Sequence, residues 1–583
     1  MQSFRAHHVF RISGLLFLAT LTGANVQAAD GTLVVKSEPD ECYNGLGEPY
    51  QPYLGEGSCG EGSIAKRNQT YGWALTSHGT DLWIGTGANV SCLGATAGAI
   101  FSGEIPSFEA APNCLDGGGP CLTVCEGPES QFLYERFPLP VPLIERLADS
   151  FLGIIGDWRP PEVWVHDTSS GVANQERIAI DDTSLQSTLG LRGAGAHDGV
   201  VLMGGPTITG IGLQMFAFDA DTKEFIGSRT YLRYSNVRRF VSYRNDLYLG
   251  VQKTGGGGAV LRWTGNRSDP FDFVTVGEID NEVAYLAVYE HRLVASTWVP
   301  SPLSSAAGLL GANEPSPPGI WMSPRIPFYG LRAWHADRWR KVWDLSDYEP
   351  DPVIAASGGI GDLHQFGGCL YFGTMHPPYV SYQAITAAYG DSVDDPDEAM
   401  TKSRRTLAIF RSCDLASWLK SPTFEVLYGE DQLPVFSPGD GEWQDTETGM
   451  GPPRYGRSGF QNDFGEPLFE NLIQIYTWSM GILDGQLCVG TQENAHSLTG
   501  GAALNGGDLW CFPDNWSPAY LANGEGLGNT GNSGFRNIER VGDSLYVATS
   551  NGENINDGNQ IPMLPAGGFE VIRVDEIVPS EPE

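Results

Sequence analysis

The chain has 583 residues, of which 35 are Lys or Arg and 70 are Asp or Glu, so its formal net charge is −35. A charge of this sign and size excludes nucleic acid and anionic membrane surfaces as partners of the protein as a whole. Apolar residues make up 41% of the chain, too many for a disordered protein, and its 75 glycines and 38 prolines indicate many tight turns.

Residues 1–28 have the pattern of a secretory signal peptide. Arg5 and Arg11 precede a short apolar stretch, and Val26 and Ala28 are small residues at the positions that a signal peptidase reads. Cleavage there removes two arginines and no acidic residue, so the net charge falls from −35 to −37. No later stretch is apolar for long enough to span a bilayer. We therefore expect an exported protein, secreted or periplasmic, without membrane insertion.

One strand motif recurs along the rest of the chain. Its seven copies, of which DLWIGT is the first, lie at 81–86, 200–205, 246–251, 292–297, 369–374, 486–491 and 544–549. Most copies follow a two-residue turn and precede a variable loop and another apolar strand, which indicates antiparallel units of three or four strands. Seven such units predict an all-β fold, a seven-bladed β-propeller, formed by residues 29–583 as a single domain.

The blade strands, such as SLYVAT at 544–549, resemble those of secreted bacterial seven-bladed β-propeller repeat proteins, whose blades carry L-Y-V-G-T followed by G-G-x-x-W. The resemblance covers most of the chain after residue 28 and implies a fold without an activity. The chain also begins with a lone strand at 31–37 and ends soon after the strand at 569–574. We expect the N-terminal strand to complete the last blade and close the ring.

Ten cysteines in an exported protein indicate disulfide bonds. Cys369–Cys413 and Cys488–Cys511 share one cross-strand register, because the two offsets within each pair, counted from the motif threonine and from the aromatic residue of the next strand, have the same sum. Both are expected to be staples within a blade. The pairing of the other six stays open: Cys42, Cys59, Cys92, Cys114, Cys121 and Cys125. They lie before or within a cysteine-bearing insertion at about 87–160.

The long loops of the predicted propeller emerge on one face. They lie at 87–160, 298–318, 375–406, 430–474, 492–506 and 551–567. Long loops on a rigid scaffold are a usual place for a binding site, although neutral variation in loop length would give the same pattern.

Counting back nine residues from the second motif residue reaches the top of each innermost strand. The residues there are Trp73, Arg192, Arg238, Ala284, Gly361, Trp478 and Arg536. The residues two places further on are all apolar, which supports the alignment because alternate strand residues share a face. The position between them adds Arg239 and Tyr285, and His364 lies just below. We expect three arginines and two tryptophans around the mouth of a central channel.

Guanidinium groups beside aromatic faces suit a carboxylate or sulfate on a carbohydrate-like ligand. The leading hypothesis is therefore an exported propeller that binds an anionic, carbohydrate-like ligand through Arg192, Arg238 and Arg536. Trp73, Trp478 and Arg239 complete this predicted site. The alternative for these residues is structural: the arginines bridge neighbouring blades through acidic partners, and the tryptophans fill space between sheets.

Two further hypotheses stay open. His364 and Tyr285 would supply the acid–base groups of a polysaccharide lyase or hydrolase, in which the arginines neutralise a uronate carboxylate. The third hypothesis is a cell-surface protein-interaction scaffold that uses the long loops alone.

Metal binding has only weak sequence support. Glu493, His496 and His376 lie on the loop-rich face and carry ligand atoms for a divalent metal, but a structural role suits each lone histidine as well. The acidic stretch 391–398 and the oxygen-rich loop 551–559 are candidates for Ca²⁺, yet neither has an EF-hand spacing, and both also suit solvated loops.

Overall fold

The structure is a computed structural model of the chain. It describes residues 29, 31–48, 51–55, 59–60, 62–90, 92, 108–109, 123–126, 157–170, 174–299, 316–417, 421–457, 474–493, 506–555 and 567–577. The signal segment 1–28, most of the 87–160 insertion, Cys114, Cys121 and His496 lie outside these residues.

The protein is mostly β-structure, and its main strands pair in antiparallel groups, each named here by its first strand. The first groups are β5 (Gln69–His78), β6 (Asp81–Ala88), β9 (Val163–Asp167), β10 (Gln175–Arg177); β11 (Gly193–His197), β12 (Val200–Pro206), β13 (Leu213–Asp219), β14 (Phe225–Tyr231); and β15 (Tyr234–Tyr243), β16 (Asp246–Lys253), β17 (Gly258–Trp263), β18 (Phe273–Ile279).

The next groups are β19 (Glu282–Tyr289), β20 (Arg292–Trp298), β21 (Gly319–Met322), β22 (Arg340–Asp344); β23 (Gly359–Phe366), β24 (Cys369–Met375), β25 (Ile409–Ser412), β26 (Glu425–Gly429); β30 (Gln474–Leu483), β31 (Gln486–Glu493), β32 (Leu509–Phe512), β33 (Tyr520–Asn523); and β34 (Asn532–Val541), β35 (Ser544–Asn551), β36 (Glu570–Val574) with β1 (Gly31–Lys36).

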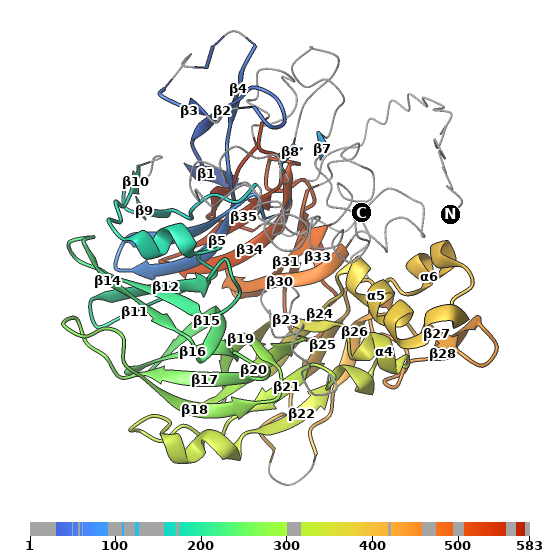
Figure 1. Ribbon diagram of the computed structural model, residues 1–583. Coiled ribbons are helices and arrows are strands. Elements are labelled where there is room, and N and C mark those ends of the chain that lie inside the picture. Colours follow the sequence, from blue (N-terminus) through green and yellow to red (C-terminus); the bar gives the residue numbers. More distant parts are fainter. Residues whose placement is uncertain are drawn as a thin grey trace.

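The groups follow one another around the body in sequence order, with outer strands such as β14, β18 and β22 toward the periphery (Figure 1). The first strands contact one another in the order β5, β11, β15, β19, β23, β30 and β34, and β34 contacts β5. The N-terminal strand β1 pairs antiparallel with β36, from Gly31 opposite Val574 to Lys36 opposite Glu570. The first and the last of the described strands therefore share one sheet.

The threonine that ends five of the seven motif copies has a specific structural role. Its hydroxyl accepts the backbone N–H of the residue at or just before the start of the third strand. The donors are Glu162 to Thr86 (2.7 Å), Gly319 to Thr297 (2.8 Å), Ala408 to Thr374 (2.8 Å), Asp508 to Thr491 (3.0 Å) and Glu570 to Thr549 (3.0 Å). The recurring threonine thus joins the second strand to the start of the third by a side-chain hydrogen bond.

Thr374→Val is expected to lower the free energy of unfolding by about 1–3 kcal/mol, because the buried N–H of Ala408 loses its acceptor without any large change in side-chain volume. Urea denaturation measures this difference. Thr374→Ser keeps the hydroxyl and is the control, with stability close to that of the wild type. Equal losses in both variants would assign the effect to packing instead.

Four disulfides lie within the described residues, and they indicate an oxidising compartment. Cys369–Cys413 joins the ends of β24 and β25, and Cys488 lies directly opposite Cys511 on β31 and β32. These are the two pairs that the register arithmetic predicted. The structure adds Cys42–Cys59 and Cys92–Cys125, whose pairing the sequence left open.

Smaller elements decorate the groups. A three-stranded sheet of β2 (Glu41–Tyr43), β3 (Gln51–Pro52) and β4 (Ile64–Lys66) precedes β5, and β7 (Phe108–Glu109) pairs with β8 (Val124–Cys125). Among the described helices, none is long and apolar enough to cross a membrane.

The predicted loops 375–406 and 430–474 contain structure of their own. Helices α4 (Pro352–Ala355), α5 (Pro378–Tyr389) and α6 (Pro396–Lys402) pack beside the hairpin of β27 (Gln432–Ser437) and β28 (Glu442–Glu447), around a small core that contains Ile354, Ile385 and Phe436. Figure 1 shows these elements together at one side of the body.

Candidate functional site

The predicted ring residues share one backbone feature, a β-bulge in the first strand. At the predicted ring position, the pairing of first and second strands skips one residue in five groups and two, Gly361 and Asp362, in the β23 group. The residues skipped there include Trp73, Arg238, Ala284, Gly361, Trp478 and Arg536. Arg192 directly precedes β11, and its backbone N–H donates to the Gly204 carbonyl at 2.8 Å. A bulge leaves one residue outside the hydrogen-bond ladder and redirects its side chain, so the same position in each group can point to the same place.

The three arginines at the predicted ring position lie near two tyrosines, and we call Arg192, Arg238, Arg536, Tyr285 and Tyr476 the arginine–tyrosine cluster. The hydroxyls of Tyr285 and Tyr476 lie 2.8 Å apart in a hydrogen bond. Arg238 Nη2 donates to the Tyr476 hydroxyl, and Arg536 Nη1 to the Tyr285 hydroxyl, both at 3.5 Å. Strands β15 and β30 are not neighbours in the order of first-strand contacts, so these bonds span the centre of the arrangement.

Each arginine also lies against an indole ring. The guanidinium carbon of Arg238 is 3.5 Å from the ring centre of Trp298, that of Arg192 is 4.9 Å from Trp73, and that of Arg536 is 5.7 Å from Trp478. Successive ring centres along the aromatic series Trp73, Tyr71, Trp478, Tyr476 and Trp298 are 5.5–6.0 Å apart. A continuous aromatic wall therefore holds the three cations in place through cation–π contacts.

The cluster is buried, which corrects the expectation of an open channel mouth. Arg536 is 1% exposed, Arg238 3% and Arg192 8%, and Trp73 and Trp478 are buried as well. The physical reason is packing at the centre, where the buried rings of Tyr285 and Tyr476 and the three tryptophans lie against the guanidinium groups.

Positive charge dominates the cluster. In the described part of the chain, no carboxylate lies within salt-bridge distance of any of the three arginines. The alternative role, in which these arginines join neighbouring blades through acidic partners, therefore has no ion pair to support it. Glu282 is the acidic group that acts on Arg192 and Arg238 electrostatically, and Arg239 adds a further positive charge near Arg536. Burial, together with the neighbouring Arg238 and Arg536, lowers the pKa of Arg192 to about 9.

The tyrosines do not balance this charge. Burial and the adjacent Tyr285 hold the pKa of Tyr476 well above its ordinary value of 10, so its hydroxyl is neutral. Five guanidinium nitrogens of the cluster also have no acceptor among the described residues: Nε of Arg192, Nε and Nη1 of Arg238, and Nε and Nη2 of Arg536. Buried donors are almost always satisfied in proteins, so these nitrogens are available to donate to an oxygen-bearing partner.

The structure does not join His364 to Tyr285 by a hydrogen bond among the described contacts. His364 lies on β23, half-buried, where burial lowers its pKa; Asp362 opposes this effect and Arg239 adds to it. Arg239 in turn acts on Glu539, which accepts a hydrogen bond from the Ser77 hydroxyl at 2.9 Å. His364 and Arg239 thus belong to a neighbouring polar group on the first strands.

The predicted metal ligands do not assemble within the described residues. His376 is buried, and desolvation lowers its pKa to about 3, as for a neutral core histidine. The grouping of three acidic, histidine or cysteine side chains that would suit an ion is Cys92, Cys125 and Asp157, and its two sulfurs are bonded to each other. Glu493 belongs to no such group, and His496 lies outside the described residues.

One side chain in each of the two Ca²⁺ candidates makes a structural contact. In the 391–398 stretch, the Asp395 side chain caps α6 by accepting from the N–H groups of Asp397 and Glu398. In loop 551–559, described up to Ile555, Asn554 is buried and bonds to Asn89 and to both backbone groups of Val124.

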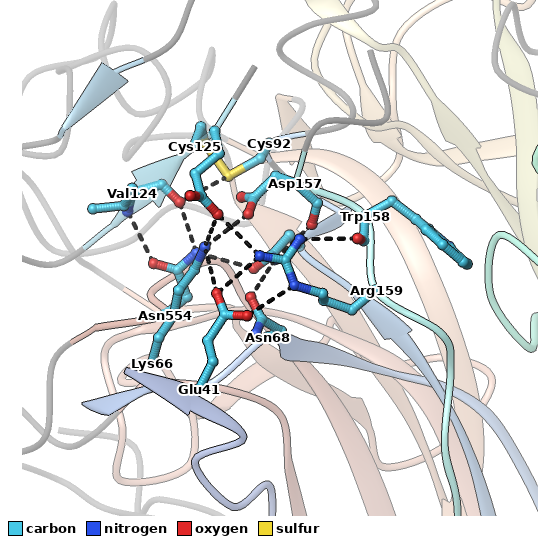
Figure 2. Close-up of polar contacts among 12 residues, drawn as sticks. Glu41, Lys66, Asn68, Cys92, Val124, Cys125, Asp157, Trp158, Arg159 and Asn554 are labelled. Atoms are coloured by element: carbon cyan, nitrogen blue, oxygen red, sulfur yellow. Dashed lines mark hydrogen bonds and ion pairs between the residues drawn. A yellow bond between two sulfur atoms is a disulfide. The ribbon is translucent and has the colours of Figure 1, made fainter. Parts of the chain in front are cut away.

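Asn554 borders a second buried cluster, formed by charged residues. Lys66 contacts Asp157 at 2.7 Å, Glu126 at 3.0 Å and Glu41 at 3.4 Å, and Arg159 contacts Glu41 and Glu126 (Figure 2). Burial raises the pKa of Asp157 to about 8, whereas Lys66 and Arg159 outweigh burial at Glu126 and lower its pKa to about 2. This charged cluster ties β2, β4 and the 123–126 and 157–160 segments together, and we assign it a structural role.

Sequence reasoning missed Tyr476, Trp298 and Glu282. A signal existed for two of them, because Trp298 directly follows the motif residue Thr297 and Tyr476 precedes Trp478 by two residues. Glu282 had no such signal, since it lies outside the strand motif and is not at the position counted back from it.

No family model matches the chain, and no curated protein matches its sequence. Among solved structures, the luciferin-regenerating enzyme aligns with TM-score 0.30 and 11% identity over 65% of this chain and 87% of its own. The β-propeller domain of the Trilobed protease from Pyrococcus furiosus aligns with TM-score 0.27 and 8% identity, over 62% and 76%. The exo-β-1,3-galactanase of Phanerochaete chrysosporium aligns with TM-score 0.27 and 8% identity, over 53% of this chain and 57% of the galactanase. One of these alignments is with a β-propeller domain, and none assigns an activity to this chain.

Proposed function

We propose that the protein is an exported seven-bladed β-propeller whose centre binds an anionic, carbohydrate-like ligand. The blade assignment is supported by the antiparallel groups, by the first strands that contact each other in cyclic order, and by β1, which pairs with β36. The four disulfides support folding outside the cytoplasm.

The observation that carries the binding proposal is the set of five buried guanidinium nitrogens in the arginine–tyrosine cluster that have no acceptor among the described residues. Three buried cations without an ion-paired carboxylate are costly unless an anion compensates them. A carboxylate or sulfate accepts several such donors at once, and the planar arginine fork matches its geometry.

The burial of the cluster sets the size of the ligand. An acidic monosaccharide or the acidic end of an oligosaccharide suits a site enclosed by Trp73, Trp478 and Trp298, because a polymer does not pass into a buried centre. The hydroxyls of Tyr285 and Tyr476 lie beside the arginines and would bond with an oxygen next to the acidic group.

Isothermal titration calorimetry with D-galacturonate, D-galactose and sodium sulfate tests this function. The wild type is expected to bind galacturonate and not galactose, and the double variant R238M/R536M is expected to bind neither. Arg540→Ala is the matched control, because Arg540 lies on the same strand as Arg536 but is exposed. No binding of either anion to the wild type would overturn the proposal, and equal binding of sulfate and galacturonate would remove its carbohydrate part.

The same samples separate binding from catalysis. A lyase that used His364 would release an unsaturated uronate from polygalacturonate, with a new ultraviolet absorbance that His364→Ala abolishes. We expect no such product, because no described contact places His364 against Tyr285.

A further inference from the structure

We propose a second ligand site on the surface of the β19 group, where residues 325–341 form a basic aromatic segment that binds a linear anionic polysaccharide. The segment runs between β21 and β22 and contains five basic residues and one acidic residue, in a chain with twice as many acids as bases. This proposal does not depend on the function proposed for the centre.

The arginines of the segment are accessible to solvent and make no ion pair among the described residues. Arg325, Arg338 and Arg340 are exposed, and Arg332 is half-buried. In the described part of the chain, none of these four arginines has a carboxylate within salt-bridge distance, and none makes a side-chain hydrogen bond to one. Arg325 and Arg340 lie close enough to Arg292 to lower its pKa, although burial is the larger cause. Like charges gathered in this way attract a polyanion locally, because salt screens the acidic remainder of the protein beyond about 10 Å.

Exposed aromatic rings lie among these cations. Phe328 is 89% exposed, Trp334 56% and Tyr329 40%, and they are three of the four exposed aromatic side chains among the described residues. The ring centres of Phe328 and Tyr329 are 5.1 Å apart, those of Tyr329 and Trp334 are 6.4 Å apart, and the Arg332 guanidinium lies 5.6 Å from the Tyr329 ring. Clustered exposed rings mark an interaction surface, and ring faces between arginines suit the alternating apolar faces and acidic groups of a polysaccharide.

Buried side chains and hydrogen bonds fix the segment on the fold, so its exposed rings have defined positions. Ile326, Leu331 and Trp339 are buried in the core next to the β15 group. Trp339 Nε1 donates to the Val276 carbonyl at 2.8 Å, and the Leu331 N–H donates to the Tyr248 hydroxyl at 3.1 Å. A fixed surface loses little conformational entropy on binding, which favours a ligand that makes many weak contacts.

The shape beside the segment favours a narrow ligand over a flat one. Arg340 and Lys341 line a hollow of about 870 Å³ together with Trp343, Ser421, Phe424 and Met450. A polysaccharide chain can follow the basic residues into a hollow. A flat anionic membrane would stay outside it and would bring the acidic remainder of a −35 chain close to its own charges.

The test measures fluorescence anisotropy of labelled polygalacturonate and labelled dextran sulfate, with neutral dextran as the uncharged probe. The triple variant R325A/R332A/R338A is expected to weaken binding of both acidic polymers about tenfold or more, and W334A to weaken it several-fold, with a smaller dependence on salt in the triple variant. The matched control R267A/R457A/R540A removes three exposed arginines elsewhere and should bind almost as the wild type does.

Other outcomes would overturn the proposal. These are equal weakening in both triple variants, and binding to phosphatidylglycerol vesicles or to single-stranded DNA without binding to the acidic polysaccharides. Arg238→Met tests independence from the centre, since it is expected to leave polymer binding unchanged. Loss of polymer binding in Arg238→Met alone would assign the polymer to the centre.

Discussion

Replacing Arg238 by methionine is expected to raise the free energy of unfolding by about 1–4 kcal/mol, in a buffer free of sulfate and phosphate. Arg238 is 3% exposed, two of its guanidinium nitrogens have no acceptor, and its one hydrogen bond, to Tyr476, is long at 3.5 Å. Methionine fills a similar volume and relieves repulsion with Arg192, while Tyr476 keeps its bond to Tyr285. Urea denaturation measures the change.

Arg405→Met is the matched control with the opposite expected sign. Arg405 is as buried as Arg238, but its Nε and Nη2 contact both oxygens of Glu349 at 2.6 and 3.0 Å. Its removal strands a buried carboxylate and should destabilise the fold by about 3–5 kcal/mol. If Arg238→Met destabilised the protein as Arg405→Met does, Arg238 would be structural, and the case for a central anion site would fail.

Lys66→Met is expected to destabilise the protein by about 3–5 kcal/mol at pH 9. The Lys66 ammonium is completely buried and contacts three carboxylates, so its loss leaves Glu41, Glu126 and Asp157 with Arg159 as their close cation. The charged cluster in Figure 2 then has too few positive charges for its acids.

The loss of unfolding free energy in Lys66→Met should become smaller as the pH is lowered from 9 to 5. Because burial raises the pKa of Asp157 to about 8, from an ordinary 3.8, the folded state takes up a proton there that the unfolded state releases above pH 4. Asp157 is therefore neutral at pH 5, and a neutral carboxyl gains less from contact with the Lys66 ammonium than a carboxylate does. Lys253→Met removes a lysine from the exposed pair with Glu278 and should cost at most about 1 kcal/mol at either pH. A Lys66→Met deficit that did not change with pH would exclude Asp157 as the titrating partner.

The repeat made much of the fold predictable. Turn pairs such as Asp484-Gly485 and the seven strand motifs place hairpins by local chemistry, and those hairpins are present as β30–β31 and its counterparts. The pairing of β1 with β36 also followed from a count of strands. What the motif could not reveal is why it ends in threonine, because the hydroxyl acts on a third strand that begins up to 76 residues further along the chain, as from Thr86 to Glu162.

The sequence predicted which residues gather at the candidate site but not that they are buried. A fixed count from the motif found Arg192, Arg238 and Arg536, because the ring position lies the same number of residues before the motif in each group; at Arg238 and Arg536 this position is a bulge. Their burial depends on Tyr476, which reaches them from another part of the chain. His376 shows the same limit, since a lone histidine in a sequence does not reveal whether it faces a metal or a dry core.

The bulges have a consequence for how such a centre can change. At Arg238 or Trp478 the side chain belongs to a residue that no cross-strand partner depends on, so it can be exchanged without shifting the register of its sheet. Gly361 marks the exception, because a Cβ there would lie 2.2 Å from the Thr477 carbonyl oxygen. At the other bulge positions, a substitution leaves the pairing of the strands unchanged. A protein with these sheets can therefore acquire a different central chemistry one residue at a time.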